Sequence, residues 1–535
     1  QLVSRARQAG LILTPRAVFQ HQTVAALAAV AMPADETRST TLDIAIGAVS
    51  PTPIMRWLAE RGGPIERFSQ SVLLQLPAGM QEQHLVATLQ ALLDHHDALR
   101  LRLVADETPD AWSLEVVPVG VVSAASYLQR IDVAGAALRD CIAEAAPQAE
   151  RRLAPQSGIM LQAVWFDAGP RAAGRLLLTV HHLAVDGVSW RILLPDLTAA
   201  WAAAARGDVP VLGPRGTSFR RWSQQLAAEA ENPRRVAELA FWTAMLRAPS
   251  VPLAAGALDP DRDVTGQARH VTLTLPADVT GPLLTQVPAA FHGGVNDVLL
   301  TGLAVAVAQW YRRQGRGGST AVLVDLEGHG REEIFAELDL SRTVGWFTSL
   351  CPVRLDPGAF DVDDAMAGGA ELGRAFKLIK EQLHALPDHG LGYGLLRYGN
   401  AQTAAQLDEL ARPQLSFNYL GRFATGAATD WGMATEADAL GVAGDPRMPL
   451  AHALEINALT LDAATGATLS VTWSWAPDLI GDAEVHALAQ AWFRALEALV
   501  RHAAQPDAGG RTPSDLPLVA LSQADIERLE RAYAN

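Results

Sequence analysis

Two adjacent histidines, His181 and His182, are the residues of this sequence best suited to proton transfer. They end the apolar run RLLLTVHH, which predicts a buried strand. Because neighbouring residues of a strand point to opposite faces, at most one histidine faces a given cavity, and the other is expected to be structural. A neutral imidazole at a strand end takes or gives a proton near pH 7. The pair therefore predicts one acid–base residue beside one structural residue.

The residues that follow the histidines predict a tight turn and the start of a helix. Asp186 and Gly187 tighten the turn, and a helix is expected to begin near Ser189 or Trp190. The N-terminal end of that helix would add a favourable dipole near the site. Asp186 is expected to be a structural anion paired with an arginine rather than a second base. A second histidine pair, at 95–96, has no such turn after it, and we assign it no chemistry.

A carboxylate follows another predicted strand. Glu327 ends the apolar run AVLVDL and opens the segment EGHGRE. Partial burial at a strand end would raise the pKa of this carboxyl group. Two groups on opposite sides of a carbon can remove a proton from one face and return one to the other. A loop carboxylate on its own is more often solvated, so the assignment of Glu327 depends on the motif around it.

Several elements that would position these residues are clear enough to predict by range. Residues 53–60 predict a helix with a proline at its start, and residues 71–79 predict a strand that ends at Pro-Ala-Gly. The apolar run 298–310 is shorter than the roughly 20 residues of a membrane span, so it predicts a buried core helix. Pro195 is expected to kink or interrupt the helix after the histidines.

Five segments, in order along the chain, resemble the epimerization branch of the condensation domain superfamily of nonribosomal peptide synthetases. They are HHLAVDGVSW (181–190), EGHGRE (327–332), RTVGWFT (342–348), PDHGLGYG (387–394) and FNYLG (417–421). The flanking segments LTPRAVFQHQTVAALA and GGRTPSDLPL resemble the last helix of a peptidyl carrier protein and the linker that leaves a module. The resemblance thus spans nearly the whole chain.

This resemblance implies roles for particular residues. His182 and Glu327 are expected to be the two acid–base groups, and Tyr419 or Asn418 to donate a hydrogen bond to an enolate-like oxyanion. Only one of the latter two can point inward from a strand, and Tyr419 is preferred. The other residues are expected to support the site: His181, Asp186, Gly187 and Trp190 in the first motif, Arg331 as the partner of Asp186 between the lobes, and His329, Trp346 and Tyr393 in its walls.

The resemblance also implies the fold. Strands and helices are interspersed in both halves, which favours two α/β (α+β) lobes, each a sheet covered by helices. Each lobe would resemble chloramphenicol acetyltransferase, and together they would form a V-shaped pseudo-dimer with a central tunnel. The expected organisation is a carrier protein fragment at 1–33, a linker at 34–40, an N-terminal lobe at 41–212, a C-terminal lobe at 213–506 and an exit linker at 507–535.

Composition argues against several other classes of protein. The chain has 43 basic and 58 acidic residues, a net charge of −15 and no basic cluster, which disfavours nucleic-acid binding. Its two cysteines supply neither a disulfide framework nor a metal cluster, and they fit a cytoplasmic location. The segments EGHG and GLGYG lack the features of phosphate-binding loops. No association with a membrane is expected.

The resemblance implies no metal and no cofactor of the chain's own. The phosphopantetheine arm of a carrier protein would tether the substrate, an L-aminoacyl or L-peptidyl thioester. The expected partners are the peptidyl carrier protein and adenylation domain of the same module and the condensation domain of the next module. Docking of the carrier is expected to be weak, with the tether supplying effective concentration, and to involve a patch that includes Arg220 and Arg221.

Two other functions stay open. In a condensing enzyme, His182 would promote attack of an amine on a thioester, and HHxxxDG does not separate this reaction from epimerization. A non-catalytic docking domain that recruits a tailoring enzyme would be expected to lose His182 or Glu327, and both are present. Glu327 favours epimerization, because condensation has no evident need for a second acid–base group. Ser69, Pro195 and Cys351 depart from family usage, and none of them removes a proposed catalytic group.

Overall fold

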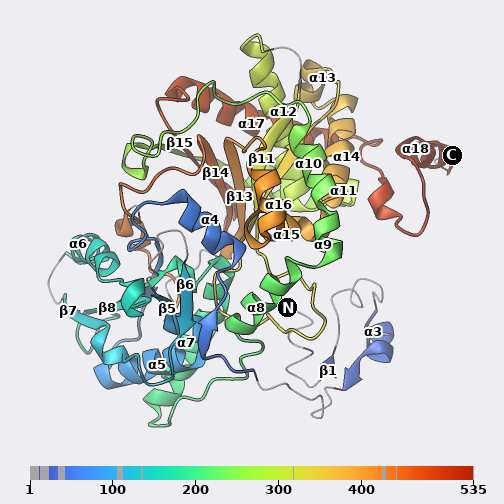
Figure 1. Ribbon diagram of the computed structural model, residues 1–535. Helices are drawn as coiled ribbons and strands as arrows, with labels where there is room; N and C mark the ends of the chain where they lie inside the picture. Colours follow the sequence, from blue (N-terminus) through green and yellow to red (C-terminus); the bar gives the residue numbers. More distant parts are fainter. Residues whose placement is uncertain are drawn as a thin grey trace.

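Two β-sheet lobes carry the residues of interest. The structure, a computed structural model, describes residues 6, 11–12, 23–33, 43–104, 112–133, 137–316, 319–424, 429–441 and 443–533. Elements of the N-terminal half form one lobe, drawn mainly in blue and cyan in Figure 1, and elements of the C-terminal half form the other, drawn mainly in yellow to red. The predicted mixed architecture of two lobes, each a sheet covered by helices, is confirmed.

The main sheet of the N-terminal lobe has four strands in the order β4-β9-β8-β7. A smaller sheet in the order β3-β6-β5 lies in the same lobe. Alternate residues of β9 enter two different cores, which explains why its sequence is apolar throughout. The strand bounds are β3 (Gly47–Val49), β4 (Ser69–Gln75), β5 (Leu101–Val104), β6 (Ser113–Val116), β7 (Leu128–Asp132), β8 (Leu161–Asp167) and β9 (Arg175–His181).

Helices cover both faces of this sheet. One face packs on α5 (Glu82–His95) and α7 (Gly187–Ala205), and the other on α6 (Leu138–Arg151). The helix α7 runs through Pro195 without a break, so the interruption is wrong, whereas the alternative of a kink there stays a prediction. Residues on both sides of the proline are buried, and this packing keeps the helix on the core despite the lost backbone donor.

The sheet of the C-terminal lobe has six strands in the order β10-β15-β14-β13-β11-β12. The pairs β11–β13 and β13–β14 are parallel, and the remaining pairs are antiparallel. The register pairs Leu326 of β11 with Phe417 of β13, and this alignment fixes which side chains are neighbours near the strand ends. The bounds are β10 (Arg269–Leu275), β11 (Val322–Gly328), β12 (Ser349–Leu355), β13 (Leu415–Ala424), β14 (Leu454–Ala463) and β15 (Gly466–Trp475).

Four long helices cover one face of the C-terminal sheet: α11 (Ala277–Phe291), α12 (Val295–Arg313), α14 (Ala370–His384) and α17 (Asp482–Ala503). The prediction of a buried core helix at 298–310 is confirmed, because α12 is buried along this stretch. Among the described residues, no single helix has the length and apolar character needed to cross a membrane, although α11 and α12, bent by 98°, pass that test as a pair.

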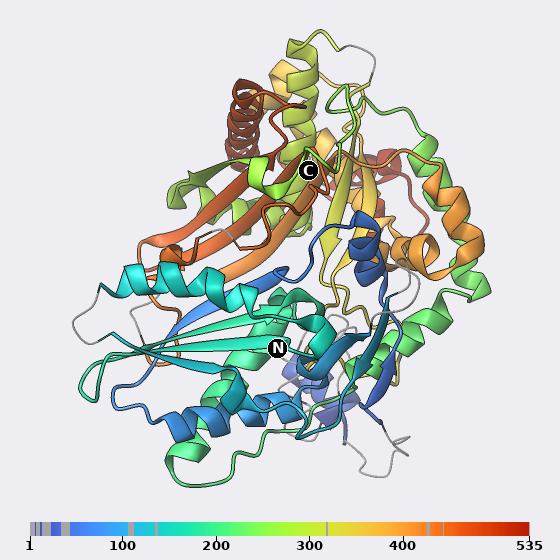
Figure 2. The same ribbon diagram turned by 60° about the vertical axis from the view of Figure 1, so that its left-hand side comes forward.

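Segments of the C-terminal half complete the core of the N-terminal lobe. The helix α8 (Phe219–Glu229) buries Phe219, Trp222 and Leu226 in that core. Residues 431–434, which we call the strap, run beside β4, where Trp431 N–H donates to Gln75 O over 2.8 Å. The cores of the two lobes therefore do not separate at residue 212. Figure 2 shows the two sheets, cyan below and orange above, from a second direction.

The two flanking regions differ in how much the structure describes. In the region 1–33, the helix α3 (Val24–Val30) begins within the segment that resembles the last helix of a carrier protein, while the linker at 34–40 lies outside the described residues. The region 507–535 contains the short helix η9 (Pro513–Asp515) and the helix α18 (Gln523–Tyr533). It is anchored to α14, because the buried Lys380 ammonium lies 2.6 Å from Asp515 Oδ1.

Candidate active site

The two histidines of the first motif have separate surroundings, as strand alternation predicts. His181 ends β9 and is fully buried, with its Nε2 2.8 Å from Ile65 O. Its Nδ1 accepts a hydrogen bond from the backbone N–H of Leu183, so Nε2 carries the ring proton. Burial lowers the pKa of His181 to about 4. His181 is thus a neutral structural residue that holds the turn after β9.

His182 lies at the beginning of the turn and is only partly buried. Its ring stacks on Phe68, with centroids 5.0 Å apart, and contacts Trp346 at 4.7 Å. Its Nε2 lies 2.9 Å from the amide nitrogen of Gln70. Loss of water at this place lowers the pKa of His182, with the nearby Asp186 carboxylate acting in the opposite direction. At neutral pH the imidazole is therefore uncharged and able to accept a proton.

Asp186 organises the turn between the lobes. Its Oδ1 caps α7 by accepting hydrogen bonds from the N–H and hydroxyl of Ser189, both at 2.8 Å. Its Oδ2 accepts one from the Arg331 guanidinium at 2.6 Å and one from the Phe347 N–H at 3.1 Å. The predicted contact between Asp186 and Arg331 is therefore present. Gly187 is the first residue of α7, so the helix begins two residues before the expected start near Ser189.

Glu327 and Asn418 are cross-strand neighbours in the C-terminal sheet. The register of β11 and β13 continues from Leu326 and Phe417 to these two residues, so their side chains leave the sheet on the same face. The Asn418 side-chain amide donates a hydrogen bond to Glu327 Oε2 over 2.8 Å. This contact holds the carboxyl group in place at the strand end.

The environment of Glu327 raises its pKa to about 7. Burial is the largest cause, and the neighbouring carboxylates Glu455 and Asp325 add to it, while His452 opposes it. His452 lies 2.8 Å from Asp325. Burial would lower the pKa of His452, but its hydrogen bond to Asp325 and the nearby Glu455 carboxylate outweigh that effect and raise it to about 9. Glu327 therefore lies beside a charged cluster and is itself partly protonated at neutral pH.

Tyr419, which was preferred over Asn418 as the oxyanion donor, does not lie on the face of the sheet that carries Glu327. Tyr419 follows Asn418 on β13, so its side chain leaves the opposite face of the sheet. There it packs against the helix-covered core, and its hydroxyl lies 2.9 Å from Thr460 Oγ1. Asn418 is the member of the pair on the face of Glu327. Sequence alternation predicted that only one residue points inward but not which one.

The residues expected in the walls have different places. Trp346 is buried and contacts both His182 and Phe68, as a wall residue would. Tyr393 packs against Trp242 with ring centroids 5.4 Å apart, and burial raises the pKa of its hydroxyl. The His329 side chain is 58% exposed, and its Nδ1 accepts a hydrogen bond from the Arg331 N–H, so its wall role stays a prediction.

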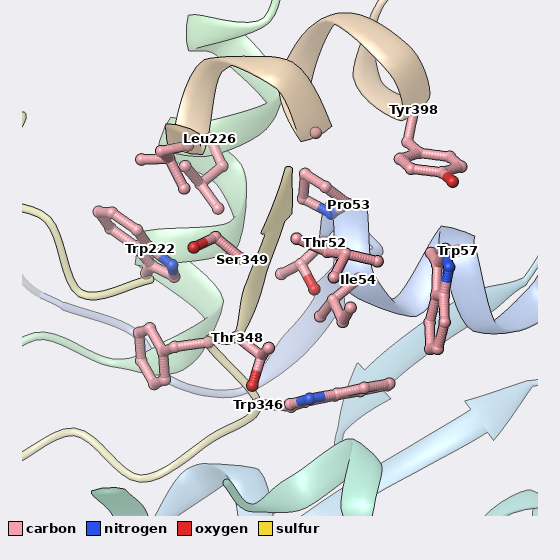
Figure 3. Close-up of a pocket in the computed structure, with 14 residues that line it drawn as sticks. Thr52, Pro53, Ile54, Trp57, Trp222, Leu226, Trp346, Thr348, Ser349 and Tyr398 are labelled. Atoms are coloured by element: carbon pink, nitrogen blue, oxygen red, sulfur yellow. The ribbon is translucent and has the colours of Figure 1, made fainter. Parts of the chain in front are cut away.

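A pocket lies beside Trp346 (Figure 3). Its lining includes Trp346, which contacts His182, and Leu350, the antiparallel partner of Glu327 on β12, but neither His182 nor Glu327 itself. It carries aromatic, aliphatic and hydroxyl side chains and no charged ones. The lining residues are Thr52, Pro53, Ile54, Trp57, Trp222, Leu226, Trp346, Phe347, Thr348, Ser349, Leu350, Leu391, Gly394 and Tyr398. A continuous tunnel through the molecule stays a prediction.

The second histidine pair belongs to a buried ion-pair network. His96 Nε2 lies 3.0 Å from Asp196 Oδ2, and Asp196 Oδ1 accepts a hydrogen bond from Arg342 over 2.6 Å. In the described part of the chain, His95, His96 and Asp196 are a group whose donor atoms lie close enough together to hold a metal ion. The Arg342 cation already neutralises the carboxylate, which makes a second cation there unfavourable.

Comparison with known proteins places this geometry in a family. A model of the condensation domain matches residues 58–516. The chain belongs to the condensation domain family. It is 36% identical over 543 residues to one of the linear gramicidin synthase proteins of Brevibacillus parabrevis, in a match that covers 99% of this chain and 7% of that synthase protein.

Solved structures of the condensation domain family show the same fold. The chain is similar to the epimerization domain from the third module of tyrocidine synthetase B, with a TM-score of 0.73, 27% identity and coverage of 86% and 97% of the two chains. It also resembles the first condensation domain of the CDA synthetase, with a TM-score of 0.56, 17% identity and coverage of 86% and 97%. The second likeness concerns the fold alone.

Three parts of the site in this condensation-family chain were missed by sequence reasoning. Gln70 and Phe68 of the β4 region contact His182, and the cluster around His452 adjoins Glu327. These contacts join residues more than a hundred positions apart, and no local pattern signals them. The only hint was strand alternation in 69–75, which places every second side chain on one face.

Proposed function

We propose that this domain epimerizes the Cα of an L-aminoacyl or L-peptidyl thioester, carried on the phosphopantetheine arm of a carrier protein, to a D/L mixture. The observation that carries this proposal is a complementary pair of ionisable groups. Burial lowers the pKa of His182 and raises the pKa of Glu327 to about 7. Near pH 7 one group is therefore ready to accept a proton and the other to donate one.

The proposed reaction has two proton transfers. One group takes the proton from Cα, and the electron pair of the C–H bond moves to the thioester carbonyl to give an enolate. The other group returns a proton to the opposite face, which restores the carbonyl with inverted configuration. Asn418 holds Glu327, and Trp346 and Phe68 hold the His182 ring, so both groups are fixed before the substrate arrives.

Condensation is the alternative within the same family. It would use His182 to promote amine attack, and the fold supports it equally well. Epimerization is favoured by Glu327, because an acid–base group with a pKa near 7 at the end of β11 has no evident task in amide formation. The similarity to the epimerization domain of tyrocidine synthetase B supports the same choice.

The partners in this proposal follow from a tethered substrate. A peptidyl carrier protein would dock between the lobes with its phosphopantetheine arm, after loading by the adenylation domain of the same module. A downstream condensation domain would select the D-configured product. The relatives of this chain are synthases much longer than the chain itself, which supports such an assembly.

The proposal is tested with a carrier protein that bears an L-aminoacyl or short L-peptidyl pantetheine, in deuterated water. Deuterium uptake at Cα and the D/L ratio after hydrolysis are followed for the wild type, Glu327→Gln and His182→Ala. We expect uptake with loss of configuration in the wild type and a loss of about 100-fold or more in each variant. Absence of exchange, together with amide formation when an acceptor amine is added, would make this a condensing enzyme.

A further inference from the structure

His182 has a polar neighbour that the proposed chemistry does not use. Gln70 of β4 lies between the indole of Trp190 and the His182 ring. Its side-chain oxygen, Oε1, accepts a hydrogen bond from Trp190 Nε1 over 2.8 Å. Its amide nitrogen lies 2.9 Å from His182 Nε2. The three side chains come from β4, the turn after β9 and α7, and they form a chain of hydrogen bonds that ends on the proposed acid–base group.

The chemistry of these groups fixes the direction of each hydrogen bond. An indole N–H is a donor only, so the amide must turn its oxygen toward Trp190. The amide nitrogen of Gln70 then faces His182, and it too is a donor only. His182 Nε2 must therefore be the acceptor, which means that it carries no proton. In the neutral ring the proton resides on Nδ1.

Packing holds the ring in this orientation. His182 lies against Phe68 with an angle of 16° between the rings and against Trp346 with an angle of 51°. A half-turn of the imidazole would leave the ring in the same plane, but it would put Cε1 in the place of Nε2 and so remove the hydrogen bond from Gln70. The charged and titratable groups next to His182 are His181, which is neutral, and Asp186, whose carboxylate is already bound by Arg331. None of these contacts competes with Gln70 for Nε2.

We propose that Gln70, fixed by Trp190, is a positioning residue that presents His182 to the substrate as a neutral imidazole with an unprotonated Nε2. The inference rests on the epimerase function proposed above. It assigns the first step: the bound substrate replaces the Gln70 amide hydrogen at Nε2, the Cα–H bond of the isomer facing His182 breaks, a proton joins Nε2, and the electron pair moves to the thioester oxygen. Protonated Glu327 then supplies a proton to the opposite face, and exchange with water resets both groups.

Gln70 also affects how His182 releases that proton to water. Once Nε2 is protonated, the ring nitrogen and the Gln70 amide both present hydrogens, so their hydrogen bond is lost. This repulsion disfavours the imidazolium and promotes release of the proton to water. A glutamate at position 70 would have the opposite effect, because its carboxylate would accept the Nε2 proton and stabilise the charged ring.

The placement is tested by NMR of the ring nitrogens of ¹⁵N-histidine-labelled full chain, with the His182 signals assigned from His182→Ala. We expect the wild type above pH 7 to show His182 with a protonated Nδ1 and an unprotonated Nε2. In Gln70→Glu, the imidazolium should persist to a pH higher by about one unit or more. In Trp190→Phe, which keeps an aromatic ring but removes the indole donor, the two tautomers should mix. Gln83→Glu, an equal charge change on an exposed residue of α5, is the control and should leave the signals unchanged.

Exchange kinetics with a loaded carrier give the second readout. Gln70→Glu should lower kcat for deuterium exchange near pH 7 by about 3-fold to 10-fold, with KM within about twofold, and should regain activity as the pH rises. A protonated Nε2 in the wild type, or an unchanged tautomer and rate in Gln70→Glu, would overturn the proposal. If the tautomer is as expected but the wild type exchanges no Cα proton, the epimerase function fails while the placement by Gln70 holds.

Discussion

At the scale of single residues, burial has the same effect on His182 and Glu327, since it favours the uncharged form of each. For a histidine the uncharged form is the base, and for a glutamate it is the acid. In the proposed reaction, the two groups thus acquire complementary proton-transfer roles from one physical cause. Their neighbours modify the effect, because Glu455 and Asp325 reinforce it at Glu327, whereas Asp186 opposes it at His182.

Glu327→Gln should change the pH dependence of stability. The pKa of Glu327 rises from its ordinary value of 4.5 in the unfolded chain to about 7 in the folded protein, so the folded state binds more protons between these values. The contribution of Glu327 to wild-type stability therefore falls as the pH rises from 4.5 to 7, and this contribution is absent in the variant. Thermal unfolding should be measured at about pH 5 and about pH 8. The Tm of the variant relative to that of the wild type should be higher at the higher pH. An equal Tm difference at both pH values would contradict the raised pKa.

Asn418 and Tyr419 should differ sharply in their effects on exchange. Asn418→Ala removes the hydrogen bond to Glu327, and we expect deuterium exchange to fall by about 10-fold to 100-fold, in line with the ~1.5–3 kcal/mol of such a bond to a charged group. Tyr419→Phe removes a hydroxyl that contacts Thr460 on the helix-covered face. Its exchange rate should stay within about threefold of the wild type. A larger loss in Tyr419→Phe would restore tyrosine as the oxyanion donor.

Much of the candidate site could be predicted at this scale, and the limit is geometric. Strand alternation predicted that one of the two histidines is structural, and the resemblance of the motifs to the family implied that this is His181 and that Asp186 pairs with Arg331. The choice between Asn418 and Tyr419 was not, because alternation leaves open which face of β13 points to the site. Gln70 could not be predicted at all, since its contact with His182 depends on how β4 and the turn after β9 meet in space.

At the scale of elements, the ion pair between Asp186 and Arg331 joins the start of α7 to the segment between β11 and β12. Both side chains are almost completely buried, at 5% and 9% exposed. The guanidinium also lies over the Phe347 ring, 4.0 Å from its centroid. The position of the His182 turn is therefore coupled to the segment that carries Trp346, and the two walls of the site are set together.

Arg331→Met should destabilise the fold strongly. The substitution leaves the buried Asp186 carboxylate without its cation, which typically costs about 3–5 kcal/mol. Arg312→Met is a matched control, because Arg312 pairs with Asp363 at the surface, where the two side chains are 47% and 76% exposed. Its cost should stay below about 1 kcal/mol. Chemical denaturation of both variants measures the loss in the free energy of unfolding. Equal losses would show that the buried ion pair does not stabilise the fold more than the exposed one.

The elements themselves were predicted unevenly. Helices at 53–60 and 298–310 have clear apolar patterns and correspond to α4 (Pro53–Arg61) and α12. A kink or an interruption at Pro195 was predicted from local chemistry, and tertiary packing keeps α7 continuous through this residue. The pairing of the strap with β4 had no local signal, because hydrogen bonds between backbones of distant segments do not depend on residue type.

At the scale of the whole molecule, the strap is the clearest link between the lobes. It hydrogen-bonds to β4 from both Trp431 and Ala434, and the Trp431 ring packs on Trp201 with centroids 5.5 Å apart. Trp201 belongs to α7, the helix that Asp186 caps. The strap therefore touches the same sheet and the same helix that position His182.

Trp431→Ala should loosen this link without unfolding the C-terminal sheet. The loss of a buried tryptophan costs about 3–5 kcal/mol where the site cannot collapse. Hydrogen exchange followed by mass spectrometry should show faster exchange at β4 and at the strap, while β13 and β14 keep their protection. Uniform acceleration over the whole chain would mean that the strap is part of one global unfolding unit.

The sharing of core residues between the halves bears on how the polypeptide can be divided. A chain cut at 212/213 would leave its first fragment without Phe219, Trp222, Leu226 and Phe347, which fill its interior from the second. That fragment would expose a large apolar cavity and aggregate when produced alone. Co-expression of the two fragments should keep the first fragment soluble by fragment complementation. If catalysis is also reconstituted from the two polypeptides, it would report assembly of the shared interior rather than mere proximity of His182 and Glu327.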